Sequence, residues 1–189
     1  MEDQKTVTGS ITVRIIDDMK DLDDAMAIRR RVFHHEQRVD PQMEVDGLDE
    51  DCVQFLAYYD GEPAGTCRLM EKSPFIKMQR LAVDAKYRGK GIGSALLDSV
   101  AAYVRSMHPE LLLVALAQMT AANLYERAGW SYVDESNVIY EQKMAHKLIM
   151  FLPKTRDEIE KLLLVKSISQ NGSQLCQEVK KLLNEMNLV

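Results

Sequence analysis

Apolar residues alternate with polar ones in several short segments of the chain, and each of these segments predicts a β-strand. The first is 11–16, which is rich in β-branched residues. Segments 53–59 and 63–70 flank Asp60-Gly61, a dipeptide that is typical of a tight hairpin turn. Residues 78–83 predict the third strand of the same antiparallel meander.

Farther along the chain, the continuous apolar run 111–116 predicts a central strand that is covered on both faces. Segments 130–133 and 138–144 predict a final hairpin. Apolar residues at helical spacing predict three helices between these strands: 22–32, 92–103 and 119–128. Gly129 directly follows the last of them and is a typical C-terminal helix cap.

The two ends of the chain differ from the part between them. Residues 1–10 are polar and acidic, and we expect them to form a disordered leader. A capping-box pattern at 155–158 begins an extension, residues 153–189, that predicts a helical hairpin with an apolar stripe. This stripe either packs on the chain's own domain or forms a contact with a second copy of the chain or another partner. The main domain is therefore expected to span residues 11–152.

The composition is that of a globular protein, with 46% hydrophobic and 28% charged residues among 189. A net charge of −5 argues against non-specific binding to nucleic acid or to a membrane surface. The cysteines Cys52, Cys67 and Cys176 lack C-x-x-C spacing, which favours free thiols in a reducing compartment. No apolar run approaches the roughly 20 residues that a membrane span needs. We therefore expect a cytoplasmic location.

A short basic loop rich in glycine joins the third predicted strand to the following helix. Gly89, Gly91 and Gly93 allow the backbone to turn tightly with its amides exposed, and Arg88 and Lys90 add positive charge. Such a loop before a helix N-terminus can bind a phosphate or pyrophosphate. The alternative is a strand-to-helix connection that merely tolerates glycine. Neither the P-loop pattern nor the dinucleotide G-x-G-x-x-G is present.

The loop Arg88-Gly89-Lys90-Gly91-Ile92-Gly93 matches the [QR]-x-x-G-x-[GA] signature and resembles that of the GNAT superfamily of acyl-CoA-dependent N-acyltransferases. The resemblance implies an α/β (α+β) fold with a mixed, mostly antiparallel central sheet flanked by helices. It also implies that acetyl-CoA is the co-substrate and that no metal is needed. The residues implied in coenzyme binding are Leu81, Ala82, Val83, Arg88, Gly89, Lys90, Gly91, Ile92, Gly93, Ser94 and Gln118.

Other segments are similar to the same superfamily. Residues 124–130 match its L-Y-x-x-x-G-F phrase with Trp130 in place of phenylalanine, and Gln118 stands where an asparagine is usual. Residues 31–37, with the acidic positions up to Asp49, are similar to the lip of the acceptor pocket in one branch. His146, followed by Met150, resembles the ending of the branch that includes glyphosate N-acetyltransferase, in which the histidine is taken as the catalytic base.

Acetyl transfer from a thioester to an amine needs a base, alignment of the reactants, an oxyanion donor and a proton for the departing thiolate. We expect Tyr125 to protonate the sulfur and His146 to act as the base, with a pKa near 6.5. Their alternatives are a core tyrosine and a structural histidine, and Glu36 and Glu141 are reserve bases. The adjacent histidines at 34 and 35 do not face each other on a helix, which disfavours a metal site.

The sequence therefore predicts an N-acetyltransferase that moves an acetyl group from acetyl-CoA to a primary amine by direct transfer in a ternary complex. The acceptor is expected to be a small molecule, such as an amino sugar phosphate or an amino acid. Five arginines are candidates for selecting an anionic acceptor: Arg14, Arg29, Arg30, Arg31 and Arg68. The alternatives are a peptide or protein amine, or a non-catalytic coenzyme A binding module that engages a protein partner.

Overall fold

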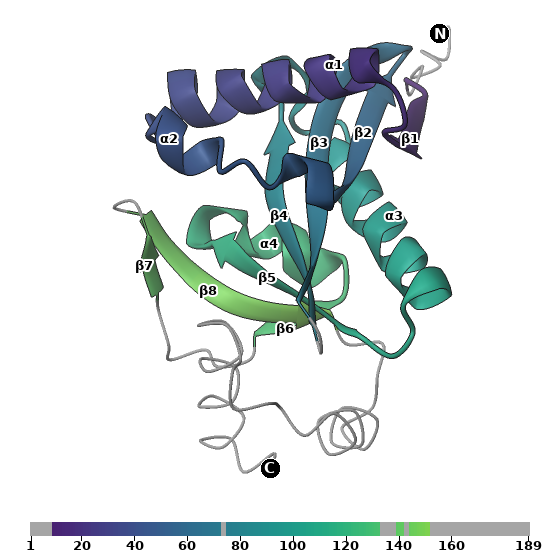
Figure 1. Ribbon diagram of the computed structural model, residues 1–189, viewed down its shortest axis with the longest axis vertical. Coiled ribbons are helices and arrows are strands. Elements are labelled where there is room, and N and C mark those ends of the chain that lie inside the picture. The colour runs from purple at the N-terminus through teal and green to yellow at the C-terminus, as the bar shows by residue number, and fades with distance from the viewer. Residues whose placement is uncertain (1–8, 73–74, 133–138, 142–143, 152–189) are drawn as a thin grey trace, which may run out of the picture.

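The computed structural model describes residues 9–72, 75–132, 139–141 and 144–151. The described residues form an eight-stranded sheet in the order β1, β2, β3, β4, β5, β8 and β6, with β7 paired to β8 (Figure 1). The strands are β1 Ile11–Ile15, β2 Val53–Tyr59, β3 Glu62–Lys72, β4 Phe75–Val83, β5 Leu112–Gln118, β6 Trp130–Tyr132, β7 Ile139–Glu141 and β8 Met144–Phe151. Among them, β4 and β5 are parallel and the other pairs are antiparallel, which confirms the predicted fold class.

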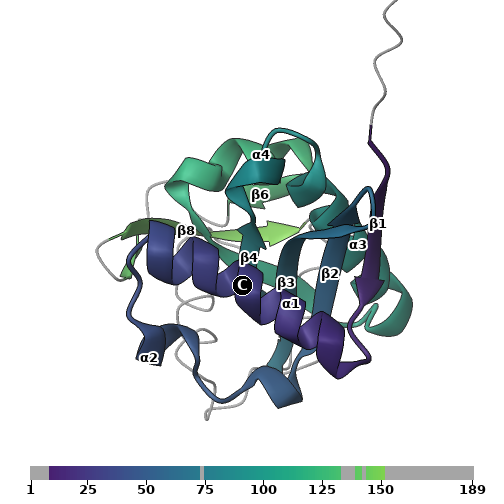
Figure 2. The same ribbon diagram turned by 90° about the horizontal axis from the view of Figure 1, so that it is seen from above.

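Helices cover both faces of the sheet, with α1 on one side of β2 to β4 and α3 and α4 on the other (Figures 1 and 2). The helices are α1 Met19–Arg29, α2 Pro41–Glu44, α3 Ile92–Met107 and α4 Ala122–Arg127. A π-helical segment, Arg30–Glu36, continues α1, and short 3₁₀ turns lie at Asp49–Asp51, Ala85–Tyr87 and Met119–Ala121. No helix among the described residues is long and apolar enough to cross a membrane.

Each face of the sheet has its own hydrophobic core. The apolar stripe of α3 is buried against one face and includes Ile92, Leu96 and Val100. The stripe of the first helix, which includes Ala25 and Ile28, is buried against the other face. Complete burial of one leucine or isoleucine side chain contributes about 1.5–3 kcal/mol, so these stripes fix both helices on the sheet.

The β2–β3 turn confirms the hairpin that Asp60-Gly61 predicts. Asp60 has φ +51° and Gly61 has φ +85°, so both central residues are left-handed, as a type I′ turn requires. This turn matches the twist of the flanking strands.

Strand β4 contains a β-bulge at Arg80 and Leu81. Thr66 pairs with Ala82 and Arg68 pairs with Gln79, so Arg80 and Leu81 together lie opposite a single residue of β3. Arg80 has φ +55°, which is uncommon for a residue with a side chain.

β4 and β5 part just before this bulge. Their pairing runs from Phe75 and Leu112 to Met78 and Ala115, and later residues of β4 have no register with β5. Residues at the ends of both strands, such as Leu81 and Gln118, line a cavity between them.

The predicted hairpin of 130–133 with 138–144 is wrong. Both β6 and β7 pair with β8, and they lie end to end along the edge of β8 that faces away from β5. Each of them has three residues, whereas β8 has eight and pairs along both edges. A long strand that satisfies backbone groups on both sides is favoured over a short isolated hairpin. Of the expected leader, residues 1–10, only Gly9 and Ser10 are described, and the backbone N–H of Ser10 donates to Oδ1 of Asp60 over 2.8 Å. The helical extension, residues 153–189, lies outside the described residues.

Candidate active site

The loop between β4 and α3 has the backbone that its glycines predict. Gly89 and Gly91 have φ +76° and +89°, a conformation that residues with a side chain rarely adopt. Gly91 is the N-cap of α3 and offers no side-chain cap to its first turn. The first amides of α3 and the positive end of its dipole are therefore suited to an anion.

Gly93 serves a different purpose from Gly91, because it permits close packing between helices. A Cβ atom at this position would lie 2.9 Å from Cδ2 of Leu124 in α4. The glycine thus brings the start of α3 against α4 and places the loop next to the helix that carries Tyr125.

Ten of the eleven predicted coenzyme-binding residues line one cleft, which we call the loop cleft, with a cavity volume of about 570 Å³. They are Leu81, Ala82, Val83, Arg88, Gly89, Gly91, Ile92, Gly93, Ser94 and Gln118. The exception is Lys90, whose ammonium lies 4.4 Å from the centre of the Tyr59 ring and 5.4 Å from that of Tyr87. Its side chain therefore stacks on aromatic rings beside the loop.

A second hollow, the inner pocket, adjoins the loop cleft and has a cavity volume of about 160 Å³. Its lining combines apolar side chains such as Phe33 and Leu116 with the polar groups of Gln79 and Tyr125. The residues that border both hollows are Gln37, Leu81, Gln118 and Ala121. A molecule in the loop cleft and one in the inner pocket would thus meet beside Leu81 and Gln118.

Gln118 contacts Gln37 across the border of the two hollows. Its Nε2 donates a hydrogen bond to Oε1 of Gln37 over 3.0 Å. Gln37 follows the π-helical segment, and Gln118 is the last residue of β5. Sequence reasoning missed Gln37, although it placed residues 31–37 at the lip of an acceptor pocket.

Tyr125 lies at the inner pocket and is 5% exposed. Its ring packs edge to face on Trp130, with centroids 5.4 Å apart and an interplanar angle of 76°. Burial raises the pKa of the Tyr125 hydroxyl well above its ordinary value, so the group stays protonated at neutral pH. It can therefore act as a proton donor.

The residues considered as bases have different positions. The backbone of His146 lies in β8, in register with Gln118 of β5 and with Ile139 of β7. Its side chain and that of Glu141 lie outside the described part of the structure. Glu36 accepts two hydrogen bonds of 2.7 Å from the guanidinium of Arg88. These bonds lower the pKa of Glu36, which makes it a poor base.

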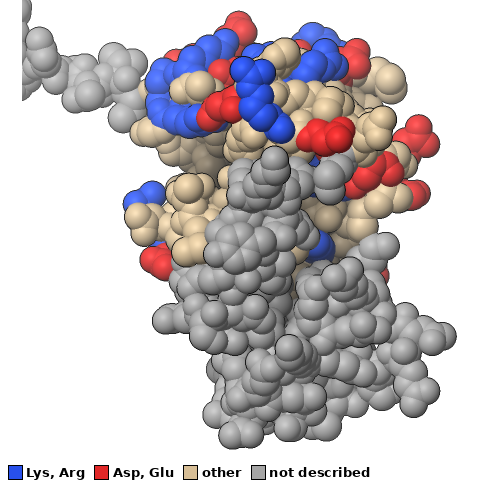
Figure 3. Space-filling view, turned by 90° about the vertical axis from the view of Figure 1, so that its left-hand side faces the viewer, with Lys and Arg blue, Asp and Glu red and all other residues tan. Residues whose placement is uncertain are grey.

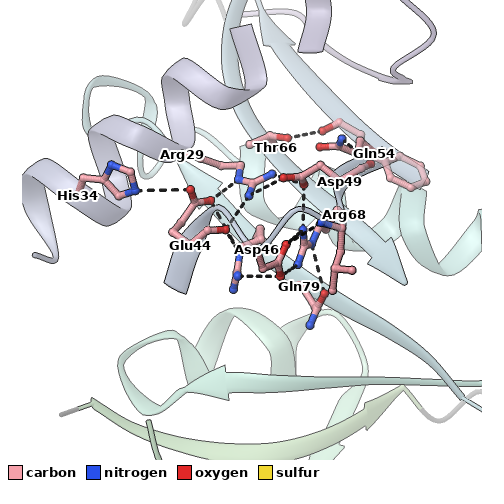
Figure 4. Close-up of polar contacts among 12 residues, drawn as sticks. Arg29, His34, Glu44, Asp46, Asp49, Gln54, Thr66, Arg68 and Gln79 are labelled. Atoms are coloured by element: carbon pink, nitrogen blue, oxygen red, sulfur yellow. Dashed lines mark hydrogen bonds and ion pairs between the residues drawn. The ribbon is translucent and has the colours of Figure 1, made fainter. Parts of the chain in front are cut away.

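None of the five arginines proposed for acceptor selection lines the inner pocket. Arg29 and Arg68 are almost fully buried and are bound by the carboxylates of Glu44, Asp46 and Asp49 (Figure 4). We call these five residues the buried ion network.

The other three arginines are at the surface. Arg14 pairs with Asp21 and Arg31 pairs with Asp84, while Arg30 is exposed. On the face shown in Figure 3, basic side chains lie beside acidic ones.

Two other cationic residues do line the inner pocket, namely Lys77 and Arg80. Arg80 also contacts the edge of the buried ion network, with Nη2 3.3 Å from Oδ2 of Asp46. His34 approaches the same network, with Nε2 3.5 Å from Oε2 of Glu44. Within the described ranges, no group of histidine, cysteine and acidic residues is arranged to hold a metal ion.

Comparison with known proteins identifies a family that matches most of the chain. Residues 16–130 match the profile of the Acetyltransferase (GNAT) family. An uncharacterized Bacillus subtilis (strain 168) protein, YyaT, is 30% identical over 132 residues, which cover 68% of this chain and 87% of YyaT. The uncharacterized N-acetyltransferase YjcF of the same strain is 27% identical over 119 residues, covering 62% of this chain and 84% of YjcF.

Solved structures share the fold. An acyl-CoA N-acyltransferase from Pseudomonas aeruginosa superimposes with a TM-score of 0.64 at 23% identity, over 76% of this chain and 99% of that one. A Bacillus subtilis acetyltransferase in complex with CoA gives a TM-score of 0.56 at 14% identity, over 76% of this chain and 99% of that one.

Proposed function

The chain belongs to the acetyltransferase (GNAT) family and is an acyl-CoA-dependent N-acetyltransferase, and from this premise we propose its substrates and its catalytic groups. The acetyl group passes from acetyl-CoA in the loop cleft to a primary amine of a small anionic molecule in the inner pocket. Transfer is direct, within a ternary complex. The observation that carries this proposal is the shared border of the two hollows at Leu81 and Gln118.

Coenzyme A fits the loop cleft by its chemistry. Its pyrophosphate would accept hydrogen bonds from the amides between Arg88 and Gly93, where left-handed glycines leave the start of α3 without a side-chain cap. The pantetheine arm would follow Leu81 to Val83, the part of β4 that has left its pairing with β5. The Bacillus subtilis acetyltransferase that shares the fold is in complex with CoA, which supports coenzyme binding by this chain.

The reaction needs two proton transfers and one stabilised oxyanion. His146 removes a proton from the amine, and the nitrogen attacks the thioester carbonyl. Backbone amides of Leu81 to Val83 stabilise the oxyanion that forms. The C–S bond then breaks, and the Tyr125 hydroxyl donates its proton to the leaving thiolate. The buried hydroxyl of Tyr125 and the register of His146 with Gln118 support these roles.

The inner pocket favours a small anionic acceptor. Its volume of about 160 Å³ suits a small molecule better than a folded peptide segment. The charged residues of its lining are Lys77, Arg80 and Glu44, and Arg80 lies within ion-pair distance of Glu44 and Asp46. The two cations support an anionic acceptor, because a phosphate or carboxylate can add a further ion pair to them. These residues take the role for which the sequence suggested the five arginines.

The test is release of free thiol from acetyl-CoA in the presence of matched pairs of amines. Each pair consists of an amino sugar phosphate and the same amino sugar without phosphate, or an amino acid and its amide. Polyamines and a lysine peptide complete the panel. A preference for the anionic member of a pair supports the proposal. Equal rates within each pair, or a preference for the lysine peptide, would contradict the proposed acceptor class.

A further inference from the structure

Two glutamine side chains meet where the loop cleft and the inner pocket share a border. Gln118 Nε2 donates to Gln37 Oε1 over 3.0 Å, and each residue lines both hollows. The two residues are 81 positions apart in the sequence. Their bond therefore links the end of β5 to the segment that follows α1.

Gln37 is held firmly at its own position. Its backbone N–H donates to the carbonyl oxygen of Val32 over 3.0 Å at the end of the π-helical segment. Its neighbour Glu36 is bound by both ends of the Arg88 guanidinium, and Nε of Arg88 donates to the carbonyl oxygen of Val83 over 3.1 Å. Gln37 is thus fixed relative to the glycine loop and the end of β4.

The bond leaves part of Gln118 available for a ligand. A primary amide has two N–H donors and one carbonyl acceptor, and Gln118 uses one donor for Gln37. The pantetheine arm of coenzyme A contains two secondary amides, each with one donor and one acceptor. The remaining N–H and the Oε1 of Gln118 match these groups in kind.

We propose that Gln37 is a positioning residue for the pantetheine arm, because it holds the side-chain amide of Gln118 ready to bind that arm. The inference rests on the proposed function. A glutamine side chain loses rotamer freedom when a ligand immobilises it. A hydrogen bond that already restrains Gln118 removes part of this cost from the binding step.

Two probes separate this role from general effects on the loop. Coenzyme A carries the pantetheine arm, whereas 3′-phosphoadenosine 5′-diphosphate keeps the pyrophosphate and lacks the arm. Calorimetric titration of the full chain with both probes gives a ratio of two affinities for each variant. Gln37→Met keeps the length of the side chain but removes the acceptor, whereas Gln37→Glu retains an acceptor for the Gln118 N–H.

Gln37→Met is expected to weaken coenzyme A binding about fivefold and to change the affinity for the nucleotide without the arm by less than about twofold. Gln37→Glu should retain the wild-type ratio. Gln118→Met should also weaken coenzyme A binding, and adding Gln37→Met to it should cause no further loss, because Gln37 acts through Gln118.

Three results would overturn the inference: an unchanged ratio in Gln37→Met, equal losses in the Met and Glu variants, or additive losses in the double variant. An unchanged ratio that arises from a similar loss of both probes would indicate a distorted loop. A wild-type chain that binds neither probe would contradict the proposed function instead, and so the two failures can be told apart.

Discussion

The Nη1 atom of Arg29 lies 2.6 Å from Oδ1 of Asp49, and the arginine side chain is only 1% exposed. This pair ties the end of α1 to the short turn before β2. Glu44 binds the same guanidinium through Nε, and Arg68 donates to Asp49 from β3 over 2.9 Å. The segment that leads from α1 to β2 is therefore fixed by charge inside the protein rather than by apolar packing alone.

Removing one charge from the buried ion network should destabilise the fold. In Glu44→Gln, the buried Arg29 loses one of its two carboxylate partners, and the free energy of unfolding should fall by about 3 kcal/mol. Urea denaturation measures this loss. Glu50→Gln, at an exposed position in the same segment, is the control and should change little. A loss below about 1 kcal/mol in Glu44→Gln would contradict the structural role of the network.

Asp46 should make stability depend on acidity. Its hydrogen bond from Arg68 holds the pKa of the carboxyl well below its ordinary value. The ionised group therefore stabilises the fold above the ordinary carboxyl pKa, and this contribution is lost as pH falls from roughly 5 towards 2. Stability of Asp46→Asn should fall less steeply over that window. Exposed Asp51→Asn should retain the wild-type slope, and an unchanged slope in Asp46→Asn would argue against the pairing.

Gly91→Ala should lower the affinity for coenzyme A about tenfold, because an alanine at φ +89° is strained and relief of the strain moves the loop amides. Calorimetric titration gives the affinity. Gly61→Ala is a matched control, since φ is +85° there and the β2–β3 turn lies outside the cleft lining. If both variants bound coenzyme A like the wild type, the pyrophosphate would have to bind elsewhere.

Tyr125→Phe should reduce kcat about a hundredfold with little change in KM, because the ring still packs on Trp130 while the proton donor is lost. Steady-state kinetics with the best amine of the panel measure the effect. Tyr103→Phe is the control, since Tyr103 also packs edge to face, on Phe55, with centroids 5.7 Å apart. Equal kcat values in wild type and Tyr125→Phe would assign protonation of the thiolate to another group.

His146→Gln should remove the acidic limb of the pH profile of kcat/KM. A histidine with the ordinary pKa near 6.5 becomes protonated as pH falls through that value, so we expect the wild-type activity to decline there. The variant should be slower and lack this decline. His108→Gln, at the C-cap of α3, should keep the wild-type profile. The same acidic limb in wild type and His146→Gln would place the base elsewhere.

Much of the fold follows from local patterns. Period-two segments gave β1 to β4, and helical spacing gave α1, α3 and α4, because each pattern reflects which side of an element faces a core. The glycine loop was also readable, since the left-handed conformations at Gly89 and Gly91 restrict the residue type.

Long-range relationships were not readable in the same way. The position of β8 between β5 and β6 depends on pairing between distant segments, which no local pattern specifies. Arg29 and Arg68 have the composition of solvated residues, although each is buried by carboxylates far away in sequence. One signal was present: Arg29 lies four residues after Ala25, on the buried stripe of α1.

The extra residue of the β4 bulge reverses the faces of the sheet on which the following side chains lie. Before it, Ile76 and Met78 belong to the core beneath α3, but Ala82, at the same even spacing, belongs to the core beneath α1. Deletion of Arg80 would remove the bulge and restore regular alternation along β4. Each residue after the deletion would then point to the opposite face of the sheet. The backbone offered to the coenzyme would then be inverted, while the first half of β4 and its neighbours could remain as they are. The extra residue of the bulge therefore determines which backbone groups of Leu81 to Val83 face the loop cleft, and point substitutions elsewhere in the site leave that choice unchanged.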